Sequence, residues 1–170
     1  KLGITPIDML LVNLYPFQKP VAKPGCTLEE AVENIDIGGP SMIRSGAKNF
    51  RSVAVITAPK RYPAILAEMQ AHDGAVGDKT LESLVVEAFA HTAEFDRAVH
   101  AYLQYKLEGE PAFPRELNLH FEKAQDLRYG ENPHQAAAFY RHQGEGGANP
   151  GAATQLHGKE LSYNNIAALD

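Results

Sequence analysis

The chain has 170 residues, of which 44% are hydrophobic and 22% are charged, which is typical of a globular protein with a sizeable core. Its formal net charge of −5 argues against a nucleic-acid-binding surface spread over the whole chain. The single cysteine, Cys26, excludes an internal disulfide and favours a reducing compartment. The apolar runs near the start are too short for a membrane span. Because the first residue is Lys1 and the last pattern is unfinished, we expect a piece of a longer protein.

Two short apolar runs, residues 8–14 and 51–57, are typical of buried parallel strands. Helical periodicity follows the second run over residues 62–69. Thr80 is then expected to cap a long helix. Its buried stripe is predicted to contain Leu81, Leu84, Val85, Ala88, Phe89, Phe95, Val99, Tyr102 and Leu103. Strands that alternate with helices favour an α/β fold with a parallel sheet.

Two further helices are predicted between the apolar runs. Thr27 and Glu30 have the spacing of a capping box, which marks a helix start. We expect this helix to end at Gly38 and Gly39. A second, short helix is expected from Pro40 to about Lys48, because proline suits the first helical turn.

The pattern changes near residues 109–114. Short segments follow at 117–121, 137–141 and 154–156, with a glycine-rich loop at 144–151. Asn164 or Asn165 is expected to cap a final helix. A second unit is therefore predicted to begin near residue 118.

The residue types between 35 and 49 suit a ligand site. Gly38 and Gly39 allow close backbone approach just before a helix N-terminus, where free N–H groups attract anions or polarised oxygens. Asp36 at the same turn suits an amide or amine donor on a ligand. Ser41, Arg44, Ser45 and Lys48 share one helical face. A site for a polar, anionic metabolite and a solvated helix face are equally compatible with this pattern.

Two other stretches could carry chemistry. Asn13 and Tyr15 follow the first predicted strand, where ligands bind in open α/β sheets, although Tyr15 could also only pack a loop. Arg128 and Tyr129, followed by Gly130, could hold a phosphate, and the alternative is a structured loop. Structural or surface roles are favoured for five scattered histidines, namely His72, His91, His100, His120 and His142.

Five ordered motifs together resemble one family. They are NLYPF (13–17), TLEEAVENIDIGGPSMIRSGAKN (27–49), AFAHTAEFD (88–96), LRYGENPHQ (127–135) and GKELSYNNI (158–166). In this order they resemble the bifunctional purine-biosynthesis enzymes, aminoimidazole carboxamide ribonucleotide (AICAR) formyltransferase/IMP cyclohydrolase. Gly46 stands where relatives usually have alanine, which costs helix stability or marks close packing against a ligand.

The resemblance implies two domains. Residues 1–115 would be the later part of an IMP cyclohydrolase domain with a methylglyoxal-synthase-like α/β fold. Residues 118–170 would begin the formyltransferase domain, which has a cytidine-deaminase-like core. The first domain closes formyl-AICAR to IMP with loss of water. The second transfers a formyl group from 10-formyltetrahydrofolate to AICAR.

The resemblance also implies site residues. Tyr15, Asp36 and Lys48 match the positions that line the cyclohydrolase site, with Lys48 as the acid/base residue. Asn13 and the backbone of Asp36, Ile37 and Gly38 match positions that contact the base, and Gly39 is counted with them among the nucleotide-binding residues. In the transferase domain, Arg128, Tyr129 and Asn165 match nucleotide-binding positions, whereas the catalytic Lys-His pair would fall after residue 170. No metal and no tightly bound cofactor are implied.

The expected protein is a cytoplasmic enzyme of purine biosynthesis that forms a homodimer and binds neither nucleic acid nor membrane. Its partners would be formyl-AICAR, AICAR and IMP, with 10-formyltetrahydrofolate as co-substrate. The isolated chain is expected to be inactive because essential segments lie outside it. One alternative is a catalytically silent nucleotide-binding or regulatory module. A second alternative is a structural α/β fragment that binds no nucleotide.

Overall fold

The computed structural model describes residues 3–109, 112–113, 118–142 and 150–168. The chain divides into two compact units, Lys1–Ala112 and Phe113–Asp170. Each unit has its own small sheet, which is parallel in the first and antiparallel in the second. The prediction of a mixed α/β chain with a small parallel sheet is confirmed.

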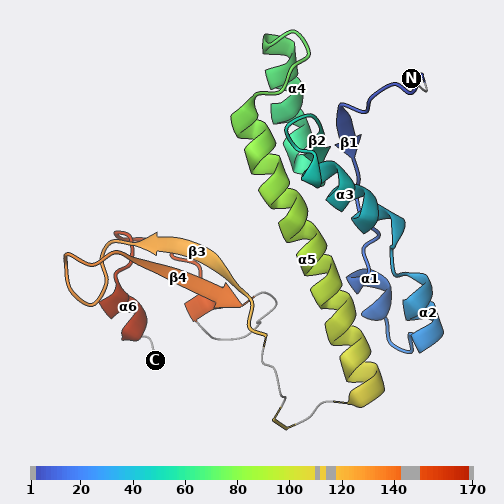
Figure 1. Ribbon diagram of the computed structural model, residues 1–170. Coiled ribbons are helices and arrows are strands. Elements are labelled where there is room, and N and C mark those ends of the chain that lie inside the picture. Colours follow the sequence, from blue (N-terminus) through green and yellow to red (C-terminus); the bar gives the residue numbers. More distant parts are fainter. Residues whose placement is uncertain (1–2, 110–111, 114–117, 143–149, 169–170) are drawn as a thin grey trace. The chain divides into compact units, whose positions relative to one another are not determined.

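In unit 1, two parallel strands are joined through helices (Figure 1). The strands are β1 (Met9–Leu11) and β2 (Ala54–Ile56). Between them lie the helices α1 (Gln18–Val21), α2 (Leu28–Glu33) and α3 (Gly38–Lys48). After β2 come the 3-10 turn η1 (Pro59–Arg61), α4 (Tyr62–Ala71) and the long helix α5 (Asp78–Glu108). The pairing of β1 with β2 is shorter than the predicted apolar runs 8–14 and 51–57. One further hydrogen bond extends it, from the Val12 N–H to the Ile56 carbonyl at 3.1 Å.

Strand β2 is buried on both faces, as its unbroken apolar run predicts. One face presents Val55 to a cluster that also contains Ile43 and Ala47 of α3 and Ala88 of α5. The other face presents Ala54 and Ile56 to a second cluster, which contains Ile65 of α4 and Leu84 of α5. Helix α5 therefore contributes to both halves of the core.

The prediction for the two glycines before Pro40 is wrong. The capping box of Thr27 and Glu30 is present, but α2 already ends at Glu33. Gly38 and Gly39 form the first turn of α3 instead of ending the preceding helix. The reason is that Asp36 binds the free N–H of Gly39 and thereby starts the new helix ahead of the proline.

Gly46 packs against the sheet and not against a ligand. A Cβ atom at this position would lie 2.7 Å from Val55 Cγ2 and 3.0 Å from Leu10 Cδ2. The glycine thus lets α3 approach the strands closely, which corrects the suggestion of a ligand contact.

Helix α5 begins earlier than predicted, because its N-cap is Gly77 and not Thr80. Glu68 of α4 supplies the capping group: its carboxylate accepts hydrogen bonds from the Gly77 N–H and from the Thr80 hydroxyl, both at 2.8 Å. Phe89, which was expected in the buried stripe, is 46% exposed. Leu84 and Ala88 are fully buried, as predicted.

Unit 2 is built on an antiparallel hairpin of β3 (Phe121–Leu127) and β4 (Ala137–His142), with an irregular register between Lys123 and Gln125. The 3-10 turn η2 (Pro150–Ala152) and α6 (Tyr163–Ala167) follow. Of the short segments expected from the sequence, 154–156 forms no strand, and neither do residues 118–120. Residue 117 and residues 144–149 of the predicted loop lie outside the described residues.

Ser162, and not Asn164 or Asn165, is the N-cap of α6. Asn165 is the third helical residue, and its side chain accepts a hydrogen bond from the Ser162 N–H. The sequence contains this S-x-x-N pattern, which fulfils the role of a capping box with asparagine in the place of glutamate or glutamine.

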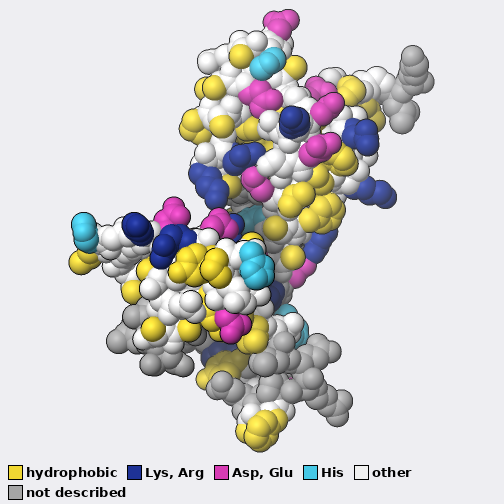
Figure 2. Space-filling view, turned by 90° about the vertical axis from the view of Figure 1, so that its left-hand side faces the viewer, with side chains coloured by type: hydrophobic (Ala, Val, Ile, Leu, Met, Phe, Trp, Pro, Cys, Tyr) yellow, Lys and Arg dark blue, Asp and Glu magenta, His cyan; other side chains and the backbone are white. Residues whose placement is uncertain are grey.

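None of the helices in the described residues is both long and apolar enough to cross a membrane. Acidic and basic side chains are interspersed on the face shown in Figure 2, and they form no extended basic field there.

Candidate functional site

The carboxylate of Asp36 joins the end of β1 to the start of α3. Its Oδ1 accepts a hydrogen bond from the Gly39 N–H at 2.8 Å, and its Oδ2 accepts one from the Tyr15 N–H at 3.4 Å. Tyr15 and Asp36 are 21 residues apart in the sequence, and this carboxylate holds their two segments together. The carboxyl end of a parallel strand and a helix N-terminus meet here, which is where α/β sheets bind ligands.

Position 39 of this junction has no room for a side chain. A Cβ atom on Gly39 would lie 2.6 Å from Asp36 Oδ2 and 2.6 Å from Leu14 Cδ2, whereas a Cβ atom on Gly38 would meet open space. The neighbouring Ile37 is 72% exposed. At this turn Ile37 and Gly38 are therefore exposed, whereas Gly39 is tightly packed.

Asn13 and Tyr15 lie on the segment that leads from β1 to this junction. The Asn13 side-chain amide donates to the Tyr62 hydroxyl at 3.4 Å, and Tyr15 is 66% exposed. The structure thus joins Tyr15, Asp36 and Gly39 of the sequence-predicted residues by hydrogen bonds, whereas the Asn13 side chain contacts Tyr62. Tyr62 was not predicted, because its contact with Asn13 spans 49 residues of sequence.

Lys48 is placed apart from the Asp36 turn. It is the last residue of α3, whose 11 residues begin at Gly38. The Cα atoms of Gly38 and Lys48 are therefore about 15 Å apart along the helix. The Lys48 side chain is exposed, and within the described residues it makes no hydrogen bond or ion pair. No direct contact between Lys48 and Asp36 is formed.

The predicted polar face of α3 is partly neutralised. Arg44 forms an ion pair with Asp96 of α5, and the Ser41 hydroxyl donates to the Ile37 carbonyl at 2.8 Å. Asp96 was not predicted as a partner, since 52 residues separate it from Arg44. Of the two cations on this face, Lys48 is therefore the one available to a ligand.

In unit 2, the segment of Arg128 and Tyr129 is paired with the segment before α6. The Arg128 N–H donates to the Leu161 carbonyl at 2.9 Å, and the Tyr163 N–H donates to the Tyr129 carbonyl at 3.1 Å. The Arg128 guanidinium lies 5.4 Å from the centroid of the Tyr129 ring, and its Nε donates to the Glu160 carbonyl. Among the described residues the terminal guanidinium nitrogens have no hydrogen-bond partner, and such a fork can bind an anion.

Asn165 follows directly on this paired backbone. Its Oδ1 accepts hydrogen bonds at 3.0 Å from both the N–H and the hydroxyl of Ser162. The three sequence-predicted residues of unit 2 therefore belong to one substructure, in which the Asn165 carbonyl oxygen is engaged and its amide nitrogen can still donate.

No group of three or more His, Cys, Asp or Glu side chains within the described residues could hold a metal ion. The chemistry available at the first junction is that of hydrogen-bond donors and acceptors and one tyrosine hydroxyl, while Lys48 lies at the other end of α3. These groups can orient an amide and transfer protons.

Comparison with known proteins gives one consistent result. The AICARFT/IMPCHase bienzyme family matches residues 46–170. Two relatives named bifunctional purine biosynthesis protein PurH, from Neisseria gonorrhoeae (strain ATCC 700825 / FA 1090) and Neisseria meningitidis serogroup A, are each 53% identical over 175 residues. These alignments cover 99% of this chain and 33% of each relative. The chain thus spans about a third of the length of the curated relatives that it matches.

Proposed function

The chain belongs to the AICARFT/IMPCHase bienzyme family, and we propose that it serves purine biosynthesis as part of an IMP cyclohydrolase joined to an AICAR formyltransferase. The observation that carries this proposal is the 53% identity to bifunctional purine biosynthesis proteins over 99% of the chain. Residues 1–115 would be the later part of a methylglyoxal-synthase-like cyclohydrolase domain. Residues 118–170 would begin a cytidine-deaminase-like transferase domain.

The cyclohydrolase reaction closes a ring. The carboxamide nitrogen of formyl-AICAR attacks the formyl carbon, a C–N bond forms, and the formyl oxygen leaves as water. Positioning and proton transfer supply most of the rate in such a step. Asp36, which is already aimed by the Gly39 and Tyr15 N–H groups, would orient the carboxamide. Lys48 or the Tyr15 hydroxyl would donate to the developing oxyanion.

The distance of about 15 Å along α3 between Gly38 and Lys48 restricts how Lys48 can take part in ring closure. Side chains on a helix lean toward its N-terminus, so Lys48 points back along α3 in the direction of Asp36. Because the carboxamide and the formyl group are neighbouring substituents of one ring, Lys48 can donate to the oxyanion only if its long side chain spans most of this distance, and the Tyr15 hydroxyl is the alternative donor. Asn13 and the Ile37–Gly38 segment would contact the nucleotide near the turn.

The second activity would use Arg128, Tyr129 and Asn165 to bind the AICAR nucleotide. The guanidinium fork of Arg128 suits a phosphate, and 10-formyltetrahydrofolate would be the formyl donor. The family resemblance supports a cytoplasmic homodimer without a tightly bound cofactor, and sedimentation of the purified protein would test the dimer.

The test is ring closure with and without Lys48. The chain, expressed within its native reading frame, is given formyl-AICAR, and conversion to IMP is followed by absorbance. Lys48→Ala should lower kcat by a factor of about 100 or more, as expected for loss of an acid/base group, while IMP still binds. Lys79→Ala, another exposed lysine of unit 1, is the matched control and should cyclise normally.

Two other results would replace the proposal. If the protein and its variant both bind IMP but neither cyclises formyl-AICAR, the chain is part of a nucleotide-binding module without chemistry. If no nucleotide binds, the chain is a structural α/β fragment.

A further inference from the structure

Tyr62 brings a polar group from α4 to the carboxyl ends of the two parallel strands. It is the first residue of α4, and its hydroxyl accepts a hydrogen bond of 3.4 Å from the side-chain amide of Asn13. Because β1 and β2 are parallel, the segments that follow them leave the same edge of the sheet, and this hydrogen bond joins the two segments. Ligands of open α/β sheets bind at this edge.

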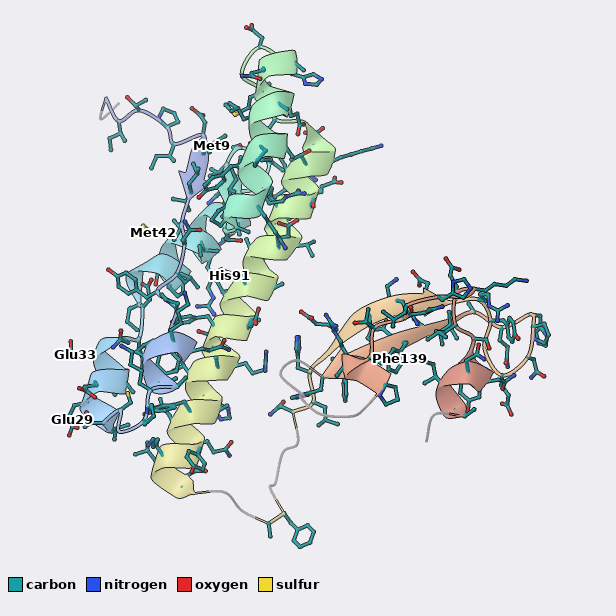
Figure 3. All side chains as sticks on the ribbon, turned by 180° about the vertical axis from the view of Figure 1, so that it is seen from behind. Met9, Glu29, Glu33, Met42, His91 and Phe139 are labelled. Carbon is teal, nitrogen blue, oxygen red and sulfur yellow. The ribbon has the colours of Figure 1, made fainter. Side chains whose placement is uncertain are left out.

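The ring of Tyr62 is held by the core. It packs against the buried cluster on one face of β2, which contains Ile56, Ile65 and Leu84. Met9 of β1, which is labelled in Figure 3, packs against the same cluster. Since a packed side chain is restricted to few rotamers, the hydroxyl at the end of the Tyr62 ring stays in one place.

Asn13 is the mobile partner of this pair. Its side chain is exposed, so the bond to the Tyr62 hydroxyl restricts an amide that solvent would leave free to rotate. The bond uses one N–H of the amide, and a second N–H and the carbonyl oxygen Oδ1 can still bind a ligand. The carboxamide of formyl-AICAR, and the neighbouring N–H and C=O groups of the base of IMP, offer one donor and one acceptor to match them.

We propose that Tyr62 is a positioning residue for nucleotide binding, whose hydroxyl orients the Asn13 amide toward the base. The inference rests on the proposed function, in which Asn13 contacts the base, and deepens it by adding a residue of α4 that acts through Asn13. A side chain that is ordered before the ligand arrives need not be ordered on binding, and this raises affinity by a factor of about 2–10.

The first experiment removes the hydroxyl and keeps the ring. Affinities for IMP and for ribose 5-phosphate, which has no base, are measured by calorimetry on the protein within its native reading frame. Tyr62→Phe should weaken IMP binding about threefold or more and leave ribose 5-phosphate binding unchanged. Tyr105→Phe, which removes the hydroxyl of an exposed tyrosine on α5, is the matched control and should bind both ligands like the wild type.

The second experiment asks whether Tyr62 acts through Asn13. Asn13→Ala should itself weaken IMP binding, and Tyr62→Phe should have no further effect in that background, because no amide remains to be oriented. In steady-state kinetics, Tyr62→Phe should raise KM for formyl-AICAR by about the same factor as the loss of IMP affinity and leave kcat unchanged, as expected for a contact that is kept throughout the reaction. A general distortion of the site would lower kcat.

The outcomes distinguish this inference from the proposed function. The inference is wrong, and the proposed function stands, if the wild-type protein binds and forms IMP but either Tyr62→Phe or Asn13→Ala binds IMP like the wild type. The same conclusion follows if Tyr62→Phe weakens IMP binding equally with and without the Asn13 amide, or if it lowers kcat. If the wild-type protein neither binds nor forms IMP, both are wrong.

Discussion

Replacing Gly39 by alanine tests how tightly the Asp36 junction is packed. The added Cβ would lie 2.6 Å from both Asp36 Oδ2 and Leu14 Cδ2, so the carboxylate or the leucine must move. Gly38→Ala is a matched control, because a Cβ at this neighbouring position meets nothing within 4 Å. Neither glycine has a positive φ angle, so alanine can adopt the backbone at both positions.

The difference between the two variants isolates the packing cost. Both gain about 0.4–1 kcal/mol from the smaller entropy of the unfolded chain, and this gain cancels in the comparison. Overpacking costs about 1–3 kcal/mol and applies to Gly39→Ala alone. We therefore expect Gly39→Ala to have a free energy of unfolding about 2 kcal/mol below that of Gly38→Ala.

Urea unfolding followed by circular dichroism measures this difference. With a urea dependence of about 2 kcal/mol per molar, the midpoint of Gly39→Ala should lie about 1 M below that of Gly38→Ala. Gly39→Ala should also bind IMP more weakly, because the displaced carboxylate no longer holds the Tyr15 segment. Equal midpoints for the two variants, or a higher midpoint for Gly39→Ala, would refute the packing argument.

Two further predictions concern contacts between helices. The Gly77 N–H and the Thr80 hydroxyl lower the pKa of Glu68 below its ordinary value of 4.5, so Glu68 stabilises the fold above that pH and the contribution is lost as pH falls through the lowered pKa. Glu68→Gln should consequently unfold at lower urea than the wild type at pH 7, with the difference vanishing toward pH 3; a constant difference would contradict this. The ion pair of Arg44 with Asp96 is about half exposed, so Asp96→Asn should cost only about 0.2–1 kcal/mol. That loss should shrink in 1 M NaCl because salt screens the pair, and a larger, salt-independent loss would show that Asp96 has another role.

The parts of the fold that depend on neighbours in sequence could be predicted. The buried strands followed from their apolar runs, and the capping box of Thr27 and Glu30 followed from its spacing. The start of α5 could not be predicted in this way, since its capping carboxylate belongs to Glu68 on a different helix. A pattern within α5 alone favours Thr80, which donates to the same carboxylate.

The same distinction holds for the candidate site. Asp36 and the two glycines lie within four residues, so their spacing indicated a site. The contact of Asn13 with Tyr62 spans 49 residues of sequence, and neither segment by itself gives a signal of it. The spacing placed Lys48 on the polar face of α3 and the family resemblance gave it the acid/base role, but the fold leaves it at the far end of α3 from Asp36.

In unit 2, Arg128 and Tyr129 are joined by main-chain hydrogen bonds to Leu161 and Tyr163, so the 31 residues 130–160 form an excursion whose two ends are fixed to each other. The entropy of closing such a loop rises slowly, by about 0.6 kcal/mol for each doubling of its length. Evolution can therefore lengthen or shorten the part of this excursion that follows β4 while Arg128, Tyr129 and the start of α6 keep their mutual placement. Insertions and deletions among homologues should accordingly concentrate between β4 and η2, and a new recognition surface could be acquired there without rebuilding the site.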